Sequence, residues 1–342
     1  MTHTLPKRIL FIRPSALGDV CRSVAVVANL KAKWPSARID WLVQSDLASA
    51  IENHPAVDRV IHFDRNAMRK WYTPKAIFKL CSFLNTLRKN NYDLVIDAQG
   101  LGRSGLFAFA TRAKIRIGPD HAREFGWLGY NQKVQIRSTH TVDQMLELSE
   151  ALDADSKDDG RLYVGQKDAA WWSAYVSKNK VPSRYLAVCP TSRWRSKQWP
   201  IECFVEVAEH LHQKGVGIVV VGAPSEHAQI FPLASLSFTY NLLPEMTIGR
   251  LLAVLNNASV VLANDSASLH MAVGLHKPCV GLFGPTDPAK VGPYKQEKSV
   301  IAAQVDYNTV HYRDSSIGDS IMRMIQPAEV IMKIDFLLES EH

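Results

Sequence analysis

The chain has 342 residues, which is long enough for two domains of ordinary size. Hydrophobic residues make up 46% of it and charged residues 21%, a balance that excludes a wholly disordered protein. The formal net charge is +7, but it is unevenly distributed: residues 1–150 carry 22 basic and 13 acidic side chains, whereas residues 151–342 carry 18 and 20. We therefore expect an anionic partner on the first portion.

Several classes of protein are disfavoured by what the sequence lacks. No segment reaches the roughly 18 consecutive apolar residues that a membrane-spanning helix needs. The five cysteines lie far apart, without a Cys-x-x-Cys pair or a histidine cluster at zinc spacing, so we expect reduced thiols and no metal site. No basic motif interleaved with aromatic residues predicts nucleic-acid binding. We expect a soluble cytoplasmic protein.

Short apolar runs alternate along the first portion with stretches of helical length, a pattern typical of parallel sheets with crossover helices. The expected strands are Arg8–Ile12, Arg38–Val43, Arg59–Phe63, Leu94–Ala98 and Lys114–Ile117. The expected helices are Val20–Lys33, Pro74–Lys89 and Arg103–Thr111. The uniformly apolar cores of these strands indicate a sheet that is covered on both faces.

The pattern starts again after a polar, glycine-terminated stretch, Asp153–Gly160, which we interpret as a linker. The expected elements beyond it are the strands Tyr185–Cys189, Gly217–Val221, Ser259–Ala263 and Cys279–Phe283 and the helices Pro200–Gln213, Ile248–Asn256 and Leu269–Gly274. The prediction is an α/β protein with two Rossmann-like, doubly wound parallel-sheet domains, residues 1–160 and 161–342, that face a central cleft. The last helix is a candidate for packing back on the N-terminal domain.

Ligands of such sheets bind beyond the carboxyl ends of the strands, so the loops that follow strands are the candidate sites. The first of these loops, Pro14–Val20, contains Gly18, which permits a close turn, and Asp19, which lies at or beside a helix N-terminus. This loop alone leaves two interpretations of Asp19 open. It is either a helix cap or a carboxylate that points into the cleft and acts as a general base.

The second loop, Gly100–Gly105, matches G-x-G-x-x-G between a strand and a helix, and Asp120 lies twenty residues after Gly100. This pattern is typical of dinucleotide binding and defines a rival hypothesis, an NAD(P)-binding oxidoreductase. Glycines that permit close helix–strand packing would produce the same pattern. Stabilisation by NADH and not by ADP would favour the oxidoreductase.

Two loops of the second portion are candidates for a phosphate site. The stretch from Thr191 to Pro200 provides two hydroxyls and then Lys197, just ahead of a helix that begins with proline. The stretch Asn264–His270 follows a strand directly and places the free amides of a helix start where a pyrophosphate would bind. The rigid loop Phe283–Pro288 follows the next strand, so we expect it near the same site.

In this order and spacing, the loops resemble those of the ADP-heptose:lipopolysaccharide heptosyltransferase family (glycosyltransferase family 9), whose members have the GT-B fold. The resemblance spans nearly the whole chain and is most specific at Asn264–His270 and Phe283–Pro288. It implies an inverting, metal-independent transfer of a heptose or related sugar from an ADP-sugar to the inner core of lipopolysaccharide. The ADP-sugar is a co-substrate, and no cofactor is implied. The implied acceptor is an anionic lipid-linked glycan, reached by peripheral contact with the cytoplasmic face of the membrane.

The resemblance also implies roles for individual residues. Asp19 corresponds to the catalytic base. The implied contacts to the donor nucleotide sugar are Thr191, Ser192, Lys197, Glu226, Asp265, Ser266, Ala267 and His270. The implied acceptor-binding residues are Arg13, Arg103 and Arg123, with Arg65, Arg69 and Lys70 in a loop often used for the same purpose.

The donor motif departs from the family pattern at Ala267, where the usual residue is glycine. The methyl group would crowd the phosphate or require a backbone conformation that alanine disfavours. A donor site disabled in this way would favour a third hypothesis, a non-enzymatic nucleotide-binding protein. A sugar-transfer assay distinguishes that protein from an enzyme.

Overall fold

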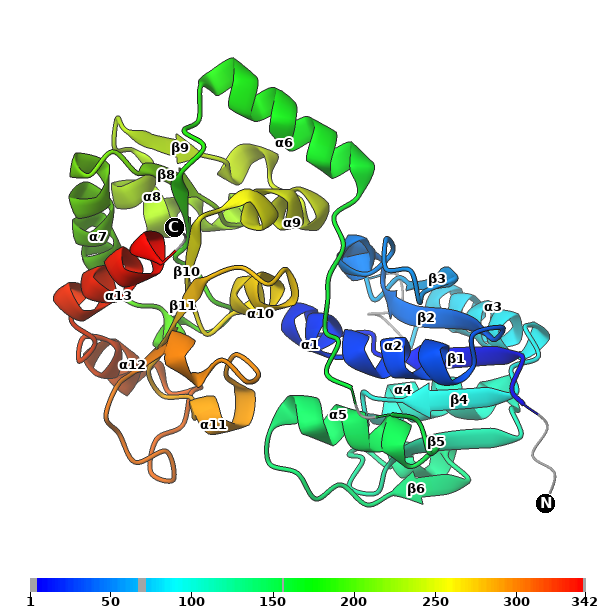
Figure 1. The fold of residues 1–342 in the computed structure, drawn as a ribbon. Coiled ribbons are helices and arrows are strands. Elements are labelled where there is room, and N and C mark those ends of the chain that lie inside the picture. Colours follow the sequence, from blue (N-terminus) through cyan, green and yellow to red (C-terminus); the bar gives the residue numbers. More distant parts are fainter. Residues whose placement is uncertain (1–4, 67–71, 156, 341–342) are drawn as a thin grey trace. The chain divides into compact units, whose positions relative to one another are not determined.

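The computed structural model describes residues 5–66, 72–155 and 157–340. Its contacts divide the chain into two compact units, Met1–Gly160 and Arg161–His342 (Figure 1). Each unit contains one six-stranded sheet in which every pair of neighbouring strands is parallel. The prediction of two doubly wound parallel sheets is therefore confirmed.

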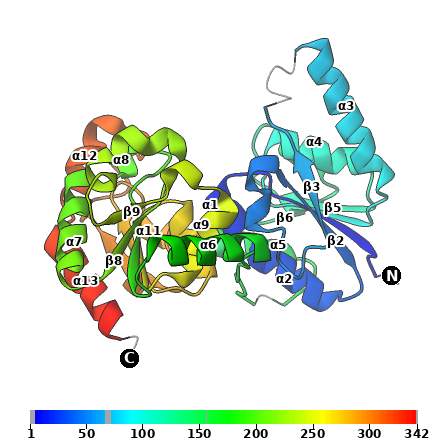
Figure 2. The same cartoon turned by 90° about the horizontal axis from the view of Figure 1, so that it is seen from above.

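The sheet of the first unit has the strand order β3-β2-β1-β4-β5-β6. Its strands are β1 (Arg8–Ile12), β2 (Arg38–Gln44), β3 (Arg59–Phe63), β4 (Leu94–Asp97), β5 (Ile115–Pro119) and β6 (Gln132–Val134). Its helices are α1 (Leu17–Arg22), α2 (Val24–Lys33), α3 (Pro74–Lys89), α4 (Gly102–Thr111) and α5 (Thr141–Glu150). Figure 2 shows α3 and α4 on one face of the sheet and α2 and α5 on the other, and the helices of each pair contact one another.

The helix expected at Val20–Lys33 is in fact two helices, α1 and α2, which meet at Ser23. The Ser23 hydroxyl donates hydrogen bonds to the carbonyl oxygens of Asp19 and Val20, at 2.9 and 3.0 Å. A serine that bonds back to the preceding turn competes with the helical backbone pattern. The first turn, which carries Asp19, is thereby separated from the longer helix that covers the sheet.

The second unit repeats the architecture in the order β12-β11-β10-β7-β8-β9. Its strands are β7 (Tyr185–Cys189), β8 (Gly217–Val220), β9 (Thr239–Asn241), β10 (Val260–Asn264), β11 (Cys279–Phe283) and β12 (Val300–Ala302). Its helices are α6 (Gln166–Asn179), α7 (Ile201–Gln213), α8 (His227–Ala234), α9 (Ile248–Asn257), α10 (Ala267–Gly274), α11 (Pro288–Val291), α12 (Ser315–Met322) and α13 (Pro327–Glu339). The last helix, α13, packs on α7, and its Val330, Ile334 and Leu338 belong to the core of this unit.

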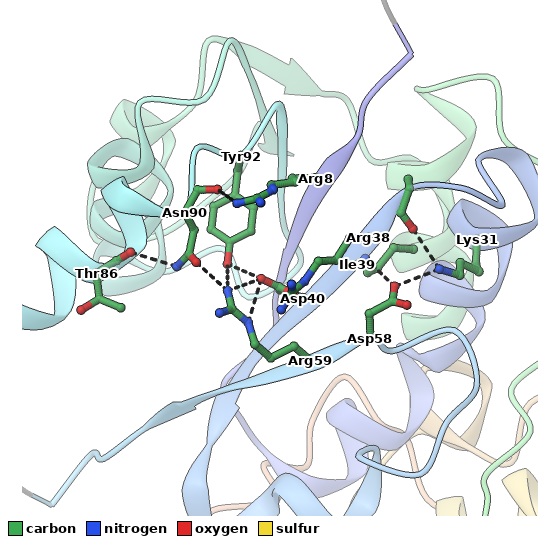
Figure 3. Close-up of polar contacts among 11 residues, drawn as sticks. Arg8, Lys31, Arg38, Ile39, Asp40, Asp58, Arg59, Thr86, Asn90 and Tyr92 are labelled. Atoms are coloured by element: carbon green, nitrogen blue, oxygen red, sulfur yellow. Dashed lines mark hydrogen bonds and ion pairs between the residues drawn. The ribbon is translucent and has the colours of Figure 1, made fainter.

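A polar cluster ties the amino ends of the strands in the first unit to the end of α3 (Figure 3). Its centre is Asp40 of β2, whose side chain is 3% exposed. Asp40 accepts hydrogen bonds from Arg59 at 2.5 Å, Tyr92 at 2.7 Å and Arg38 at 3.0 Å. Arg59 also donates to Asn90, the residue that follows α3, at 2.7 Å. These charge-assisted bonds fix the carboxyl end of α3 against the sheet.

The second and third glycines of the G-x-G-x-x-G pattern lie against backbone. A Cβ atom on Gly102 would lie 2.5 Å from the Glu124 carbonyl oxygen, and one on Gly105 would lie 2.2 Å from that of Gly126. The segment that approaches them includes the short 3₁₀ turn η2 (Gly126–Gly129). Close packing of α4 therefore accounts for the pattern without a dinucleotide.

We predict that Gly105→Ala destabilises the protein by about 1–3 kcal/mol, because the added methyl group overpacks a backbone contact. Urea unfolding followed by circular dichroism measures the change. The control is Gly160→Ala, where the nearest neighbour of the new methyl group would be the Asp158 carbonyl oxygen at 3.9 Å. Equal stability of the two variants would contradict the packing role of Gly105.

Candidate active site

Both sheets place one pair of strands at the point where the strand order reverses. In the first unit β1 pairs with β4, and in the second β7 pairs with β10. The connections that follow these two strands lead to opposite faces of the sheet, and ligands of such folds bind in the crevice at the carboxyl ends of this strand pair. The two reversal points are therefore the positions to search for binding chemistry.

Asp19 lies at the reversal point of the first sheet, in the six-residue helix α1. The N-cap of α1 is Ala16, so the interpretation of Asp19 as the helix cap is wrong. Its carboxylate is held between two guanidinium groups, with Oδ2 2.9 Å from Arg13 and Oδ1 2.5 Å from Arg22. The side chain is 26% exposed, whereas the arginine side chains are 10% and 12% exposed. The carboxylate is thus fixed in orientation and open to one side.

The loop after β4 completes this region. The Arg13 guanidinium donates to the Ala98 carbonyl oxygen, and the Ser15 amide donates to Gln99 Oε1 at 3.1 Å. A cavity of about 380 Å³ has Asp19 in its wall. Its other polar lining residues are Arg13, Gln99, His121, Arg123, Thr141 and Gln144. Two of the predicted acceptor-binding arginines, Arg13 and Arg123, therefore share a cavity with Asp19.

Asp97, the last residue of β4, is fully buried below the same loop. It accepts hydrogen bonds from the Gln99 amide at 2.8 Å and from the Tyr130 hydroxyl at 2.6 Å. Burial raises the pKa of the Asp97 carboxyl group, and these hydrogen bonds oppose that rise. Asp97 thus anchors the backbone that forms one wall of the cavity.

The other predicted acceptor arginines lie elsewhere in the first unit. Arg65 and Arg103 line a second cavity, of about 760 Å³, together with Phe63, Leu80 and Leu106. The Arg103 guanidinium lies 5.5 Å from the centre of the Phe63 ring, within cation–π range. Arg69 and Lys70 lie outside the described residues.

An ion pair marks the reversal point of the second sheet. Lys197, at the end of the 3₁₀ turn η3 (Arg195–Lys197), lies 2.6 Å from Asp265, and the two side chains are 13% and 8% exposed. The Ser192 hydroxyl donates to the Asp265 carbonyl oxygen at 2.9 Å. The Lys197 ammonium group also lies 4.8 Å from the centre of the Tyr312 ring. The lysine is thus held in one place by a carboxylate and a ring face.

Two more of the predicted donor residues meet at the end of β8. Glu226 closes the short turn η4 (Pro224–Glu226), and its Oε2 accepts hydrogen bonds from the Thr191 hydroxyl at 2.8 Å and from the Ala223 amide at 2.7 Å. The structure therefore joins Thr191 and Glu226 directly, although they are distant in the sequence.

The start of α10 has free hydrogen-bonding capacity. Ser266 is its N-cap but makes no side-chain capping bond, so the first-turn amides lack that partner. Among the described residues, the buried hydroxyls of Ser266 and Thr286 are two of the few buried side-chain groups without a hydrogen-bond partner. Such groups in native proteins call for an explanation, and a polar ligand is one. These two hydroxyls follow neighbouring strands, β10 and β11.

The structure also settles the backbone at Ala267. This residue is the first of α10, and it is absent from the described residues with positive φ. The expectation of a conformation that alanine disfavours is therefore wrong, because helical geometry suits alanine. His270 is buried in the same helix, with 6% of its surface exposed.

Two features are absent from the described parts of the chain. No group of three or more His, Cys, Asp or Glu side chains there is arranged to hold a metal ion. Among the helices of the same residues, none is both long enough and apolar enough to cross a membrane.

Three residues of these sites were missed by the sequence analysis. Arg22 follows Asp19 by three residues, a spacing that brings side chains together on a helix, so a signal for it existed. Tyr130 and Tyr312 reach Asp97 and Lys197 through tertiary packing alone. No local pattern in the sequence predicts those two contacts.

Comparison with known proteins places this fold in one class. The crystal structure of a glycosyl transferase family 9 protein from Veillonella parvula superposes with a TM-score of 0.86 at 21% identity and covers 99% of both chains, a likeness of fold alone. The structure of Escherichia coli heptosyltransferase WaaC with ADP has a TM-score of 0.77 at 26% identity and covers 96% of this chain and 99% of that one. The architecture is therefore that of a GT-B glycosyltransferase.

Sequence comparison identifies the family. The model of "Glycosyltransferase family 9 (heptosyltransferase)" matches residues 80–317. Lipopolysaccharide heptosyltransferase 1 of E. coli K12 is 30% identical over 304 residues, which cover 86% of this chain and 93% of that protein. The Salmonella typhimurium LT2 protein of the same name is 31% identical over 295 residues, 84% and 91% of the two chains. This chain belongs to glycosyltransferase family 9, the heptosyltransferase family.

The Asp97–Tyr130 pair yields a prediction about pH. A carboxyl group whose pKa is raised on folding contributes stability below its unfolded pKa of about 3.9, and that contribution is lost as the pH rises through the folded-state pKa. Tyr130→Phe removes a hydrogen bond that favours the carboxylate, so it raises this pKa further. We predict a loss of about 1.5–3 kcal/mol at pH 8 and a smaller loss at about pH 4.5.

Urea unfolding of the wild type and of Tyr130→Phe at the two pH values measures this difference in stability. The matched control is Tyr185→Phe, which removes a buried hydroxyl that donates to the Val254 carbonyl oxygen at 2.6 Å. A carbonyl does not titrate, so the control should lose the same stability at both pH values. The same pH-independent behaviour in Tyr130→Phe would refute the role assigned to Asp97.

Proposed function

We propose that this enzyme transfers a heptose or related sugar from an ADP-sugar to the inner core of lipopolysaccharide, by inversion and without a metal ion. The observation that carries the proposal is the buried Lys197–Asp265 pair beside the uncapped start of α10. The printed names of the relatives, lipopolysaccharide heptosyltransferases, support the substrate class. The WaaC structure with ADP supports an adenine nucleotide as the donor's leaving group.

The second unit binds the donor. As the bond between the sugar and the diphosphate breaks, negative charge grows on the phosphate oxygens. A fixed ammonium group and the first-turn amides of a helix stabilise that charge without reorganisation. Lys197 provides the first and α10 the second, while the hydroxyls of Ser192 and Ser266 lie beside them. Glu226 holds the nucleotide ribose, oriented by Thr191.

The first unit binds the acceptor, and Asp19 is the general base. The acceptor hydroxyl attacks the anomeric carbon, its proton passes to the Asp19 carboxylate, and ADP leaves with the electrons of the broken bond. One displacement with one base inverts the anomeric centre. The Arg13 and Arg22 guanidinium groups orient the carboxylate, and Arg123 adds positive charge to the same cavity for an anionic glycan. Arg65 and Arg103 serve the acceptor from the second cavity.

The reaction needs no cofactor, since the ADP-sugar brings its own leaving group. We place it at the cytoplasmic face of the membrane, where a lipid-linked acceptor is reached by peripheral contact. Mass spectrometry of the products formed from ADP-heptose and a panel of truncated lipopolysaccharide acceptors tests the function directly. A mass increase of one heptose on an inner-core acceptor is the expected result, and no transfer to any member of the panel would refute the proposal.

We predict that Asp19→Ala lowers the turnover number by about 100- to 10,000-fold, because the acceptor hydroxyl loses its base. ADP binding measured by calorimetry should be retained, since the nucleotide binds the second unit. Glu52→Ala, an exposed carboxylate in the same unit, is the control and should keep full turnover. Undiminished transfer by Asp19→Ala would eliminate Asp19 as the base.

We also predict that chelation with EDTA leaves the transfer rate within about twofold of its starting value. Lys197 and the amides of α10 already supply the positive charge that a divalent cation would otherwise bring. The assay is sugar transfer before and after chelation, followed by addition of Mg²⁺ or Mn²⁺. Activity that disappears with EDTA and returns with either cation would show that the mechanism requires a metal.

A further inference from the structure

The amino-terminal half of α3 exposes large apolar side chains. Phe78 is 76% exposed and Ile77 is 48% exposed, although both lie in the interior of a regular helix. Over the whole of α3, the fully buried side chains are Ala76 and Leu87. Adjacent exposed apolar residues on a stable helix mark a surface that meets another apolar phase.

This exposure does not come from a loosely attached helix. The carboxyl end of α3 is fixed by buried Leu87 and by Asn90, which joins the Asp40 cluster through Arg59 (Figure 3). Leu80, Phe83 and Leu84 pack in part against the core below. Figure 2 shows the amino-terminal end of the same helix standing clear of the sheet of its unit. The helix is thus anchored at one end and presents Ile77 and Phe78 at the other.

The charge of α3 indicates the chemistry of the occupant. Its sixteen residues include four basic side chains, Lys75, Lys79, Arg88 and Lys89, and no acidic one. Lys75 and Lys79 are exposed and flank the two apolar residues along the chain. Apolar side chains bordered by lysines match the interface of an anionic bilayer, where the apolar groups enter the headgroup region and the ammonium groups meet phosphates.

The position of this surface connects it to the rest of the unit. Ile77 precedes Leu80 by one helical turn, and Leu80 lines the 760 Å³ cavity together with Leu106, Arg65 and Arg103. A crossover helix runs antiparallel to the strands it joins, so the amino-terminal end of α3 lies at the carboxyl edge of the sheet. That edge also carries the loop of Asp19.

We propose that the amino-terminal half of α3 docks this protein on an anionic lipid bilayer. Ile77 and Phe78 insert at the interface, and Lys75 and Lys79 bind lipid phosphates. Docking holds the cavity of Arg65 and Arg103 at the membrane surface. The proposal rests on the proposed function only in that the bilayer also carries the acceptor.

Vesicle flotation of the full chain tests the docking. The probes are vesicles of phosphatidylcholine alone and vesicles with about one quarter phosphatidylglycerol. The wild type should bind the anionic vesicles and bind the neutral ones at least about tenfold more weakly. Ile77→Ser/Phe78→Ser should lose at least about tenfold in affinity for anionic vesicles. Lys75→Gln/Lys79→Gln should lose about fivefold per lysine, and less at high salt.

The matched control is Phe336→Ser, because Phe336 is 62% exposed and stands near Lys333 on α13 of the second unit. This variant should bind vesicles like the wild type. Unchanged binding by Ile77→Ser/Phe78→Ser, or equal loss in the control, would overturn the proposal. A wild-type dimer in sedimentation that this double variant abolishes, without a change in vesicle binding, would assign the surface to a second copy of the chain instead.

Transfer assays separate failure of the docking from failure of the function. Ile77→Ser/Phe78→Ser should transfer sugar normally to a deacylated, soluble acceptor and at least about tenfold more slowly to an acceptor embedded in anionic vesicles. Equal rates on the embedded acceptor would contradict docking by α3. A wild type that uses neither acceptor would refute the proposed function, while the flotation result would still decide the docking.

Discussion

Parallel pairing of the first strand with the fourth is the constraint on which both candidate sites depend. In the first unit Ile12 lies opposite Asp97, so the loops that carry Asp19 and Gln99 leave the sheet side by side. In the second unit β7 and β10 pair in the same way, and Asn264 links their loops by donating to the Pro190 carbonyl oxygen and accepting from the Trp199 amide. Side chains far apart in the sequence thus meet because two strands are neighbours, and any change in this pairing would separate them.

The two units share this strand pairing but differ in the charge that surrounds their central ionic residue. Asp19 has two guanidinium partners, so its surroundings carry a net positive charge that suits an anionic acceptor while the carboxylate stays in place. Lys197 has one carboxylate partner, Asp265, so the pair carries no net charge, and in the proposed donor site the start of α10 adds positive potential beside the ammonium group. The net charge of the sequence follows this division, since the excess of basic residues lies within the first 150. Local neutrality at Lys197 is compatible with anion binding because helix amides add positive potential without a formal charge.

The sequence predicts the strands of four or more residues well, but it misses the shorter strands, tertiary contacts and some long helices, α5 and α6 among them. Strands such as Leu94–Asp97 are apolar on both faces and stand out, whereas the three-residue strands β6, β9 and β12 are too short to show a period. The division at Ser23 depends on a side-chain hydrogen bond, which no hydrophobic pattern records. Glycine is equally suited to a phosphate-binding turn and to close packing between a helix and a neighbouring segment. The packing role of Gly105 therefore follows only from the structure, in which the Gly126 backbone lies against it. The motif loops could be recognised from their local sequence patterns. Their contacts with Tyr130 and Tyr312 could not, because these tyrosines are brought in by tertiary packing.

The Asp40 cluster and the exposed end of α3 can be understood together. Two adjacent apolar side chains in water favour association or local unfolding, so a helix that presents them must be held by contacts elsewhere. The contacts that fix α3 lie at the amino edge of the sheet and join Asp40, Arg59 and Asn90. Phe78 lies near the other end of the helix. The helix runs antiparallel to the strands. Its fixed carboxyl end therefore lies at the amino edge of the sheet, and its exposed amino end lies at the carboxyl edge, which also carries the candidate site. The first unit thereby separates the contacts that stabilise α3 from the exposed apolar end of the helix, and it keeps that end at the edge of the sheet that carries the candidate site.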